Sequence, residues 1–172
     1  MVRLLGAVLI LAGAAGMGWD YCNRLRGHYQ QLLLWKEYIW CIEYEMVQRR
    51  RPLPEIAALL KERQEPPFEA FFADMEAELQ KYENSSPRII WQELAEKYRK
   101  DFHWSGEEAR IFADCGSLVG QTGRDMVPEA AKQLMEQIDF CIGKEQRELA
   151  GKLKVSAYLC AAGGVFLVLV LI

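Results

Sequence analysis

The chain has 172 residues and a formal net charge of -3 at pH 7. That length fits one domain, or one domain with membrane segments, and the balanced charge argues against a nucleic-acid-binding protein. Both ends of the chain are apolar, because the middle contains every Asp and Glu and every Lys and Arg except Arg3. The two ends and the middle therefore predict different structures.

The first charge-free segment, Leu4 to Trp19, is typical of a membrane helix. As a helix it spans roughly 24 Å, slightly less than a hydrocarbon core of about 30 Å, so neighbouring turns must contribute. A cleaved signal peptide is the alternative, because the small residues Ala12 to Ala15 suit a signal peptidase. We predict an N-terminal transmembrane helix over residues 1–22.

The last segment, Val155 to Ile172, is also charge-free and spans roughly 27 Å as a helix. Arg3 is the only basic residue on the outer flank of either segment. The basic residues on their inner flanks are Arg24, Arg26, Lys36, Lys144, Arg147, Lys152 and Lys154. By the positive-inside rule both inner flanks lie in the cytoplasm. The sequence thus predicts a C-terminal transmembrane helix over residues 155–172 and a cytoplasmic helical bundle over residues 23–154.

Apolar residues at helical spacing predict three helices in the first half of this bundle. The first runs from Arg24 to about Gln48 and ends before Pro52, the second begins near Pro54, and the third covers Phe68 to Lys81. The predicted core positions are Leu25, Leu32, Trp35, Ile39, Ile42, Met46, Ile56, Leu59, Leu60, Phe68, Phe71, Phe72, Met75 and Leu79.

Three further helices are predicted in the second half. Ser86 and Pro87 suit the start of the fourth, and Ser105 with Glu108 forms a capping-box pattern for the fifth. A glycine-rich break from Gly116 to Gly123 precedes the last helix, with Thr122 as its predicted N-cap. The predicted core positions are Ile90, Trp91, Leu94, Tyr98, Ala109, Phe112, Cys115, Met126, Ala130, Leu134, Ile138, Ile142, Leu149 and Leu153. Without strand alternation, this pattern predicts an all-α antiparallel helical bundle.

No motif indicates catalysis or cofactor binding. The glycine-rich break lacks the GxxxxGK[ST] spacing of a phosphate-binding loop, and no GxSxG elbow surrounds Ser117. The five cysteines are scattered without a CxxC pair, which fits a reducing compartment, and two histidines do not complete a metal ligand set. We predict a non-enzymatic protein without metal, cofactor or small-molecule substrate.

Several motifs, taken in order, resemble the stage III sporulation protein AB family of endospore-forming bacteria. They are Leu4 to Ile10, Ile42 to Glu45, Pro52 and Leu53, Phe112 with Gly116, Gly120 to Thr122, Arg124 and Asp125, and the Leu/Val-rich end. The resemblance covers the whole chain. Gly123 departs from it, because the family more often has an acidic residue there, and Asp125 is the candidate for that capping role.

The resemblance implies a bundle similar to the type II secretion system F domain. It also implies a platform in the mother-cell-side membrane around the forespore, within a secretion-like channel complex. The expected partners are the cytoplasmic stage III sporulation AA-type ATPase, other membrane components of the complex and the lipid bilayer, without nucleic acid. The alternative is a signal-cleaved extracytoplasmic protein held by a C-terminal anchor. A general type II secretion platform is disfavoured, because the chain has no internal repeat.

Two places are predicted to dock the partner or to form a structural corner. The first is the basic end of the first long helix, and the second is the glycine-rich corner before the last helix. The residues concerned are Arg49, Arg50, Arg51, Gly116, Gly120, Thr122, Arg124 and Asp125.

Overall fold

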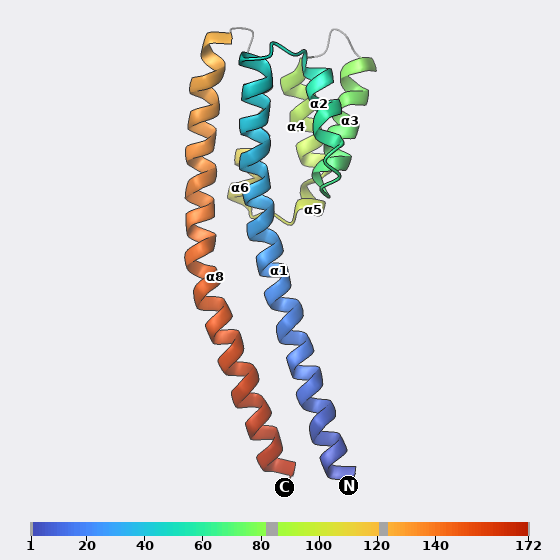
Figure 1. The fold of residues 1–172 in the computed structure, drawn as a ribbon, viewed down its shortest axis with the longest axis vertical. Coiled ribbons are helices and arrows are strands. Elements are labelled where there is room, and N and C mark those ends of the chain that lie inside the picture. The colour runs from blue at the N-terminus through green and yellow to red at the C-terminus, as the bar shows by residue number, and fades with distance from the viewer. Residues whose placement is uncertain (1, 82–85, 121–123, 172) are drawn as a thin grey trace. The chain divides into compact units, whose positions relative to one another are not determined.

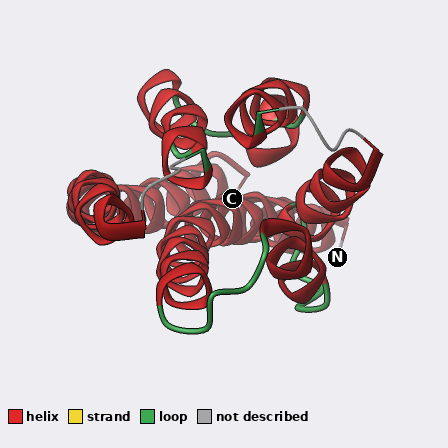
Figure 2. Ribbon diagram, turned by 90° about the horizontal axis from the view of Figure 1, so that it is seen from above, coloured by secondary structure: helices red, strands yellow, loops and turns green. Residues whose placement is uncertain are grey.

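The computed structural model describes residues 2–81, 86–120 and 124–171, which form helices joined by short turns (Figure 1). These residues contain no strand, as Figure 2 shows, so the predicted all-α class is confirmed for them. The α-helices are α1 (Val2–Val47), α2 (Leu53–Lys61), α3 (Phe68–Lys81), α4 (Pro87–Lys97), α5 (Arg99–Phe102), α6 (Gly106–Asp114), α7 (Gly116–Val119) and α8 (Val127–Leu171). A 3-10 helix, Arg124–Met126, precedes α8.

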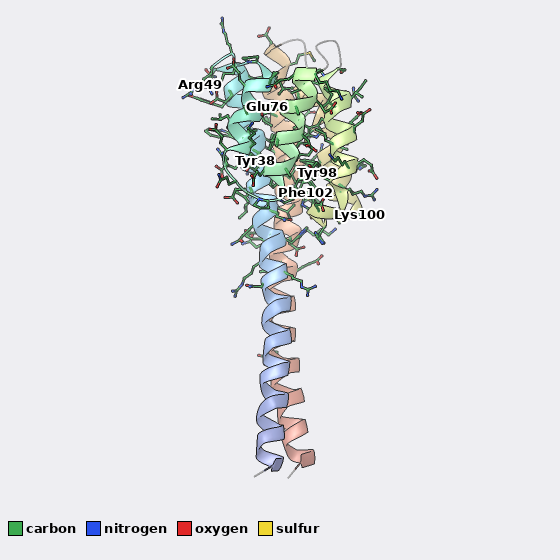
Figure 3. All side chains as sticks on the ribbon, turned by 90° about the vertical axis from the view of Figure 1, so that its right-hand side faces the viewer. Tyr38, Arg49, Glu76, Tyr98, Lys100 and Phe102 are labelled. Atoms are coloured by element: carbon green, nitrogen blue, oxygen red, sulfur yellow. The ribbon has the colours of Figure 1, made fainter. Side chains whose placement is uncertain are left out.

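The chain divides into two compact units. One comprises residues 1–31 and 142–172, where the N-terminal part of α1 lies beside the C-terminal part of α8 (Figures 1 and 3). The other comprises residues 32–141 and is the helical bundle. The helices α1 and α8 have 46 and 45 residues, so each spans about 70 Å and contributes to both units.

The two predicted membrane segments belong to the first unit. Their backbone is helical over residues 2–22 and 155–171, and most of their side chains lie outside the described part of the chain. Among the residues that are described, no helix combines the length and the apolar character needed to cross a bilayer.

The core of the bundle is dominated by aromatic rings. Phe71 of α3 packs edge-on against Trp91 of α4, with centroids 4.9 Å apart, and lies 5.0 Å from Phe112 of α6. Phe112 in turn meets Trp35 of α1 edge-on at 5.7 Å. Each such pair adds about 0.5 to 1.5 kcal/mol beyond the burial of its area. The Trp91 indole N–H donates to the Phe112 carbonyl at 2.6 Å, so this buried polar group is satisfied.

The predicted starts of α4 and α6 are confirmed. The Ser105 hydroxyl accepts a hydrogen bond from the Glu108 N–H at 3.3 Å, and the Glu108 carboxylate accepts one from the Ser105 N–H at 2.7 Å. This reciprocal pair begins α6. Ser86 is the N-cap residue of α4, although its side chain makes no capping hydrogen bond. The bounds of α3 are those predicted.

The short helices α5 and α7 were not predicted. In α5 the aromatic ring of Phe102 is fully buried and stacks on Trp104, with centroids 4.2 Å apart. His103 ends this helix in the left-handed conformation, with φ 53°, and so turns the chain toward α6. The sequence pattern missed α5 because a single helical turn is too short to show an apolar period.

The predicted core was wrong by one residue at the start of α8. Met126 is 63% exposed, whereas its neighbour Val127 is buried, and Ala131 rather than Ala130 reaches the core. The predicted positions are spaced four residues apart, which drifts from the helical period of 3.6 residues, whereas the buried Val127, Ala131, Leu134 and Ile138 combine steps of four and three. Several other predicted positions are only half-buried: Met46, Leu59, Leu79, Tyr98, Ala109, Ala130 and Leu149. The side chains of Leu25 and Leu153 lie outside the described residues.

Candidate docking site

The basic end of α1 is a turn held by backbone hydrogen bonds rather than a frayed helix end. The Gln48 N–H donates to the Tyr44 carbonyl at 2.9 Å, and the Arg51 N–H reaches back to the Glu45 carbonyl at 3.0 Å. Arg50 between them has φ 57°, in the left-handed region that favours glycine. The turn therefore holds a non-glycine residue in a strained conformation.

Two of the three arginines neutralise a buried carboxylate. Glu45 is only 5% exposed, and its carboxylate lies 3.1 Å from Arg51 Nε and 3.7 Å from Arg49 Nε. A buried carboxylate left unpaired would be costly, so these two arginines stabilise the turn. Arg50 is exposed and makes no ion pair within the described part of the chain. Arg50 therefore differs from Arg49 and Arg51, whose side chains are engaged by Glu45.

The glycine-rich corner is a close helix contact. A Cβ atom at Gly116 would lie 3.0 Å from the Arg88 carbonyl oxygen and 3.3 Å from Trp91 Cβ, and one at Gly120 would lie 2.9 Å from Arg88 Cβ. No described glycine has a positive φ. Both glycines are therefore required because α4 approaches α7 closely, not because the backbone is left-handed. Gly116 is buried, which makes it a structural residue.

The remaining predicted site residues lie beyond this corner. Thr122, with its predicted capping role, falls outside the described residues. Arg124 belongs to the 3-10 helix, although its side chain lies outside the description, and Asp125 is exposed. In Figure 1 the end of α1 and the start of α8 lie at the same end of the bundle. The fold thus brings Arg49 to Arg51 and Asp125 to one end of the bundle.

A groove between α6 and α8 was not predicted. It has a volume of about 590 Å³, and its lining residues lie within residues 107–114 of α6 and 133–140 of α8. Its lining residues are Glu107, Arg110, Ile111 and Asp114 on α6, and Gln133, Glu136, Gln137 and Phe140 on α8. The signal in the sequence was Phe140, which interrupts the polar face of α8 and is 60% exposed.

A pair of exposed aromatic side chains, Trp40 and Tyr44, lies on α1. Trp40 is 56% exposed and stacks on Tyr44, with centroids 5.7 Å apart. The guanidinium of Arg49 lies 5.7 Å from the centre of the Tyr44 ring, within the range of a cation–π contact. This contact is a second way in which Arg49 stabilises the end of α1.

Two of the buried thiols have a raised pKa. Burial raises the pKa of the Cys115 thiol and also that of Cys41, so both stay protonated and unreactive at neutral pH. Burial likewise raises the pKa of Tyr38 to about 12. Among the described residues, no group of three His, Cys, Asp or Glu is arranged to hold a metal ion.

The class that these features define is an all-helical protein whose aromatic bundle is continuous with two long terminal helices. A family model described as stage III sporulation protein AB matches residues 3–172. The chain therefore belongs to the stage III sporulation protein AB family. No curated protein and no solved structure matches it.

Proposed function

We propose that this protein is a non-enzymatic membrane platform of a sporulation-specific secretion-like channel between mother cell and forespore, and that its bundle docks the cytoplasmic ATPase. Membership of the stage III sporulation protein AB family over residues 3–172 carries this proposal. The likeness of the bundle to the type II secretion F domain belongs to the same proposal, because it rests on family analogy.

The long helices support a role in mechanical coupling. α1 and α8 each continue from the aromatic core of the bundle into a charge-free end of the chain. A force on the bundle would pass along continuous helices, whose hydrogen bonds all lie along the axis. We propose that these ends anchor the protein in the membrane with residues 23–154 in the cytoplasm. A platform built in this way transmits movement of the ATPase to membrane partners.

The signal-cleaved alternative makes a different prediction for the N-terminal part of α1. Cleavage at the small residues Ala12 to Ala15 would cut within the helix Val2–Val47. The mass of the purified protein distinguishes the membrane platform from the signal-cleaved protein. An intact N-terminus is expected for the platform, and a loss of the first residues would favour the alternative.

The docking role is tested by a direct binding measurement. The 172-residue chain is reconstituted in lipid nanodiscs and mixed with the purified stage III sporulation ATPase from the same organism, and binding is measured by biolayer interferometry. We expect saturable binding that empty nanodiscs do not show. Absence of binding, both with and without ATP, would refute the docking function. An unrelated two-span protein in the same nanodiscs serves as the control.

A further inference from the structure

We propose that the groove between α6 and α8 is the surface that receives the partner, and that it binds a basic helix carrying one apolar anchor. This inference rests on the proposed docking function and names the surface and the chemistry that the partner presents. It moves the docking site away from the glycine-rich corner, where Gly116 is buried against α4.

The shape of the groove fits a helix. On α6 the lining runs from Glu107 to Asp114, and on α8 from Gln133 to Phe140, so each wall presents one helical face over two turns. The first and last residues of each stretch are seven positions apart, which corresponds to about 10 Å along the helix axis. Two helical walls of that length offer a surface against which a third helix can pack. The groove volume of about 590 Å³ has room for several side chains of such a helix.

The charge of the groove selects a basic partner. Its rim carries the carboxylates of Glu107, Asp114 and Glu136 against the single guanidinium of Arg110. The whole of residues 32–141 has the same bias, because Asp and Glu outnumber Lys and Arg there. A basic segment would therefore be steered toward the bundle and would find its complement at this rim.

Phe140 supplies the apolar anchor point. Its ring is 60% exposed on α8, whereas Ile111 on the floor of the groove is only 4% exposed. Large aromatic side chains are among the residues that contribute most to binding when a partner covers them. An apolar side chain of the docked helix would cover Phe140, and its basic neighbours would meet the carboxylates on the rim.

Two groove variants test the proposal in nanodiscs. Phe140→Ala removes the anchor, and the double variant Asp114→Lys with Glu136→Lys reverses the rim charge. We expect each to weaken ATPase binding by about 10-fold or more, the loss typical of a central interface residue. In the charge-reversed variant, binding should no longer weaken as salt rises, because salt screens attraction between opposite charges.

Matched controls lie on other helices. Ile89→Ala removes an apolar side chain that is 54% exposed on α4, and Glu69→Lys with Glu93→Lys reverses two exposed carboxylates on α3 and α4. Both controls should bind as the unchanged protein does. Circular dichroism melts show whether each variant keeps the fold. If groove and control variants bind equally well, the groove proposal is wrong, although the docking function stands.

Photocrosslinking separates the groove from the identity of its partner. A benzoylphenylalanine at position 140, compared with one at position 89, is activated in sporulating cells, and the crosslinked peptide is identified by mass spectrometry. A basic ATPase peptide at position 140 supports both proposals. A basic peptide of another component there supports the groove and refutes the ATPase as its occupant. Absence of any position-specific product at 140 refutes the groove.

Discussion

Single aromatic residues account for much of the stability of the bundle. Phe71 touches rings of three other helices within the bundle, and its side chain is fully buried. The apolar spacing in the sequence marked this residue as core, but it did not show which rings would meet. Only the packing of α3 against α4, α5 and α6 determines those partners.

Phe71→Ala should lower the free energy of unfolding by about 3 to 5 kcal/mol, because it leaves a cavity among close-packed rings. Thermal and denaturant melts followed by circular dichroism measure the loss. Ile89→Ala, on an exposed side chain, is the matched control and should change stability little. A negligible loss at Phe71 would mean that this ring is not part of the core.

Gly120→Ala should destabilise the bundle by about 1 to 3 kcal/mol, because the added methyl group would lie 2.9 Å from Arg88 Cβ. Gly120→Val should cost more for the same reason. Gly106→Ala is the control, since nothing lies within 4 Å of its added Cβ. This substitution only lowers the conformational entropy of the unfolded chain. Equal melting temperatures for the Gly120 and Gly106 variants would contradict a close contact between α4 and α7.

At the scale of elements, the turns and caps are set by local sequence, whereas their strain and pairing depend on neighbours. Ser105 with Glu108 could be read as a capping box directly, and the structure has that box. The turn at the end of α1 could not be read in the same way. Its arginines looked like a solvated basic end, but two of them face a carboxylate that only the fold buries.

Arg50→Gly should raise the free energy of unfolding by about 0.5 to 1 kcal/mol, since glycine adopts φ 57° without the steric cost of a Cβ. The same change should leave the ion pairs of Glu45 intact. Lys132→Gly, within the regular helix α8, is the control and should lose about 1 kcal/mol. A loss at both positions would show that Arg50 contributes a contact of its own.

The stability contributed by the contact between Asp74 of α3 and the end of α4 should depend on pH. Hydrogen bonds from Lys97 and from the Tyr98 hydroxyl, the latter at 2.7 Å, hold the pKa of Asp74 below its ordinary value of 3.8. The pKa is depressed in the folded state, so this stabilisation is present above pH 3.8 and is lost as the pH falls through the folded pKa. Melting temperatures across this range should fall less steeply for Asp74→Asn. Identical pH profiles would contradict the depressed pKa.

At the scale of the whole molecule, the membrane topology remains the central prediction. The natural cysteines of the bundle are poor reporters, because Cys41, Cys115 and Cys141 are all buried. An added thiol at an exposed position, Glu93→Cys on α4, reports accessibility instead. In this variant the two terminal thiols are removed by Cys22→Ser and Cys160→Ala.

With residues 23–154 in the cytoplasm, a membrane-impermeant maleimide should label Glu93→Cys only after the cells are permeabilised. The parent lacking the added thiol controls for reaction at the buried cysteines and should stay unlabelled in both conditions. Labelling of intact cells would reverse the topology and make the signal-cleaved extracytoplasmic protein the leading alternative.

Local chemistry along the chain was enough to predict the helical class, the bounds of α3, the capping box of α6 and most core positions. These features depend on the period of apolar residues and on caps within a few residues, which any reader of the sequence can see. The family resemblance was likewise carried by short motifs in order, and the family match over residues 3–172 agrees with it.

The tertiary structure alone decided the features that join distant segments. Three such features depend on which helices become neighbours. They are the burial of Glu45 beside two arginines, the approach of α4 to Gly116 and Gly120, and the groove beside Phe140. Helical periodicity gives the face of one helix, but it does not say which other face will lie against it. For that reason the sequence predicted a docking site at glycines and arginines, whereas the groove that we propose as the docking surface could be found only from the packing of α6 and α8.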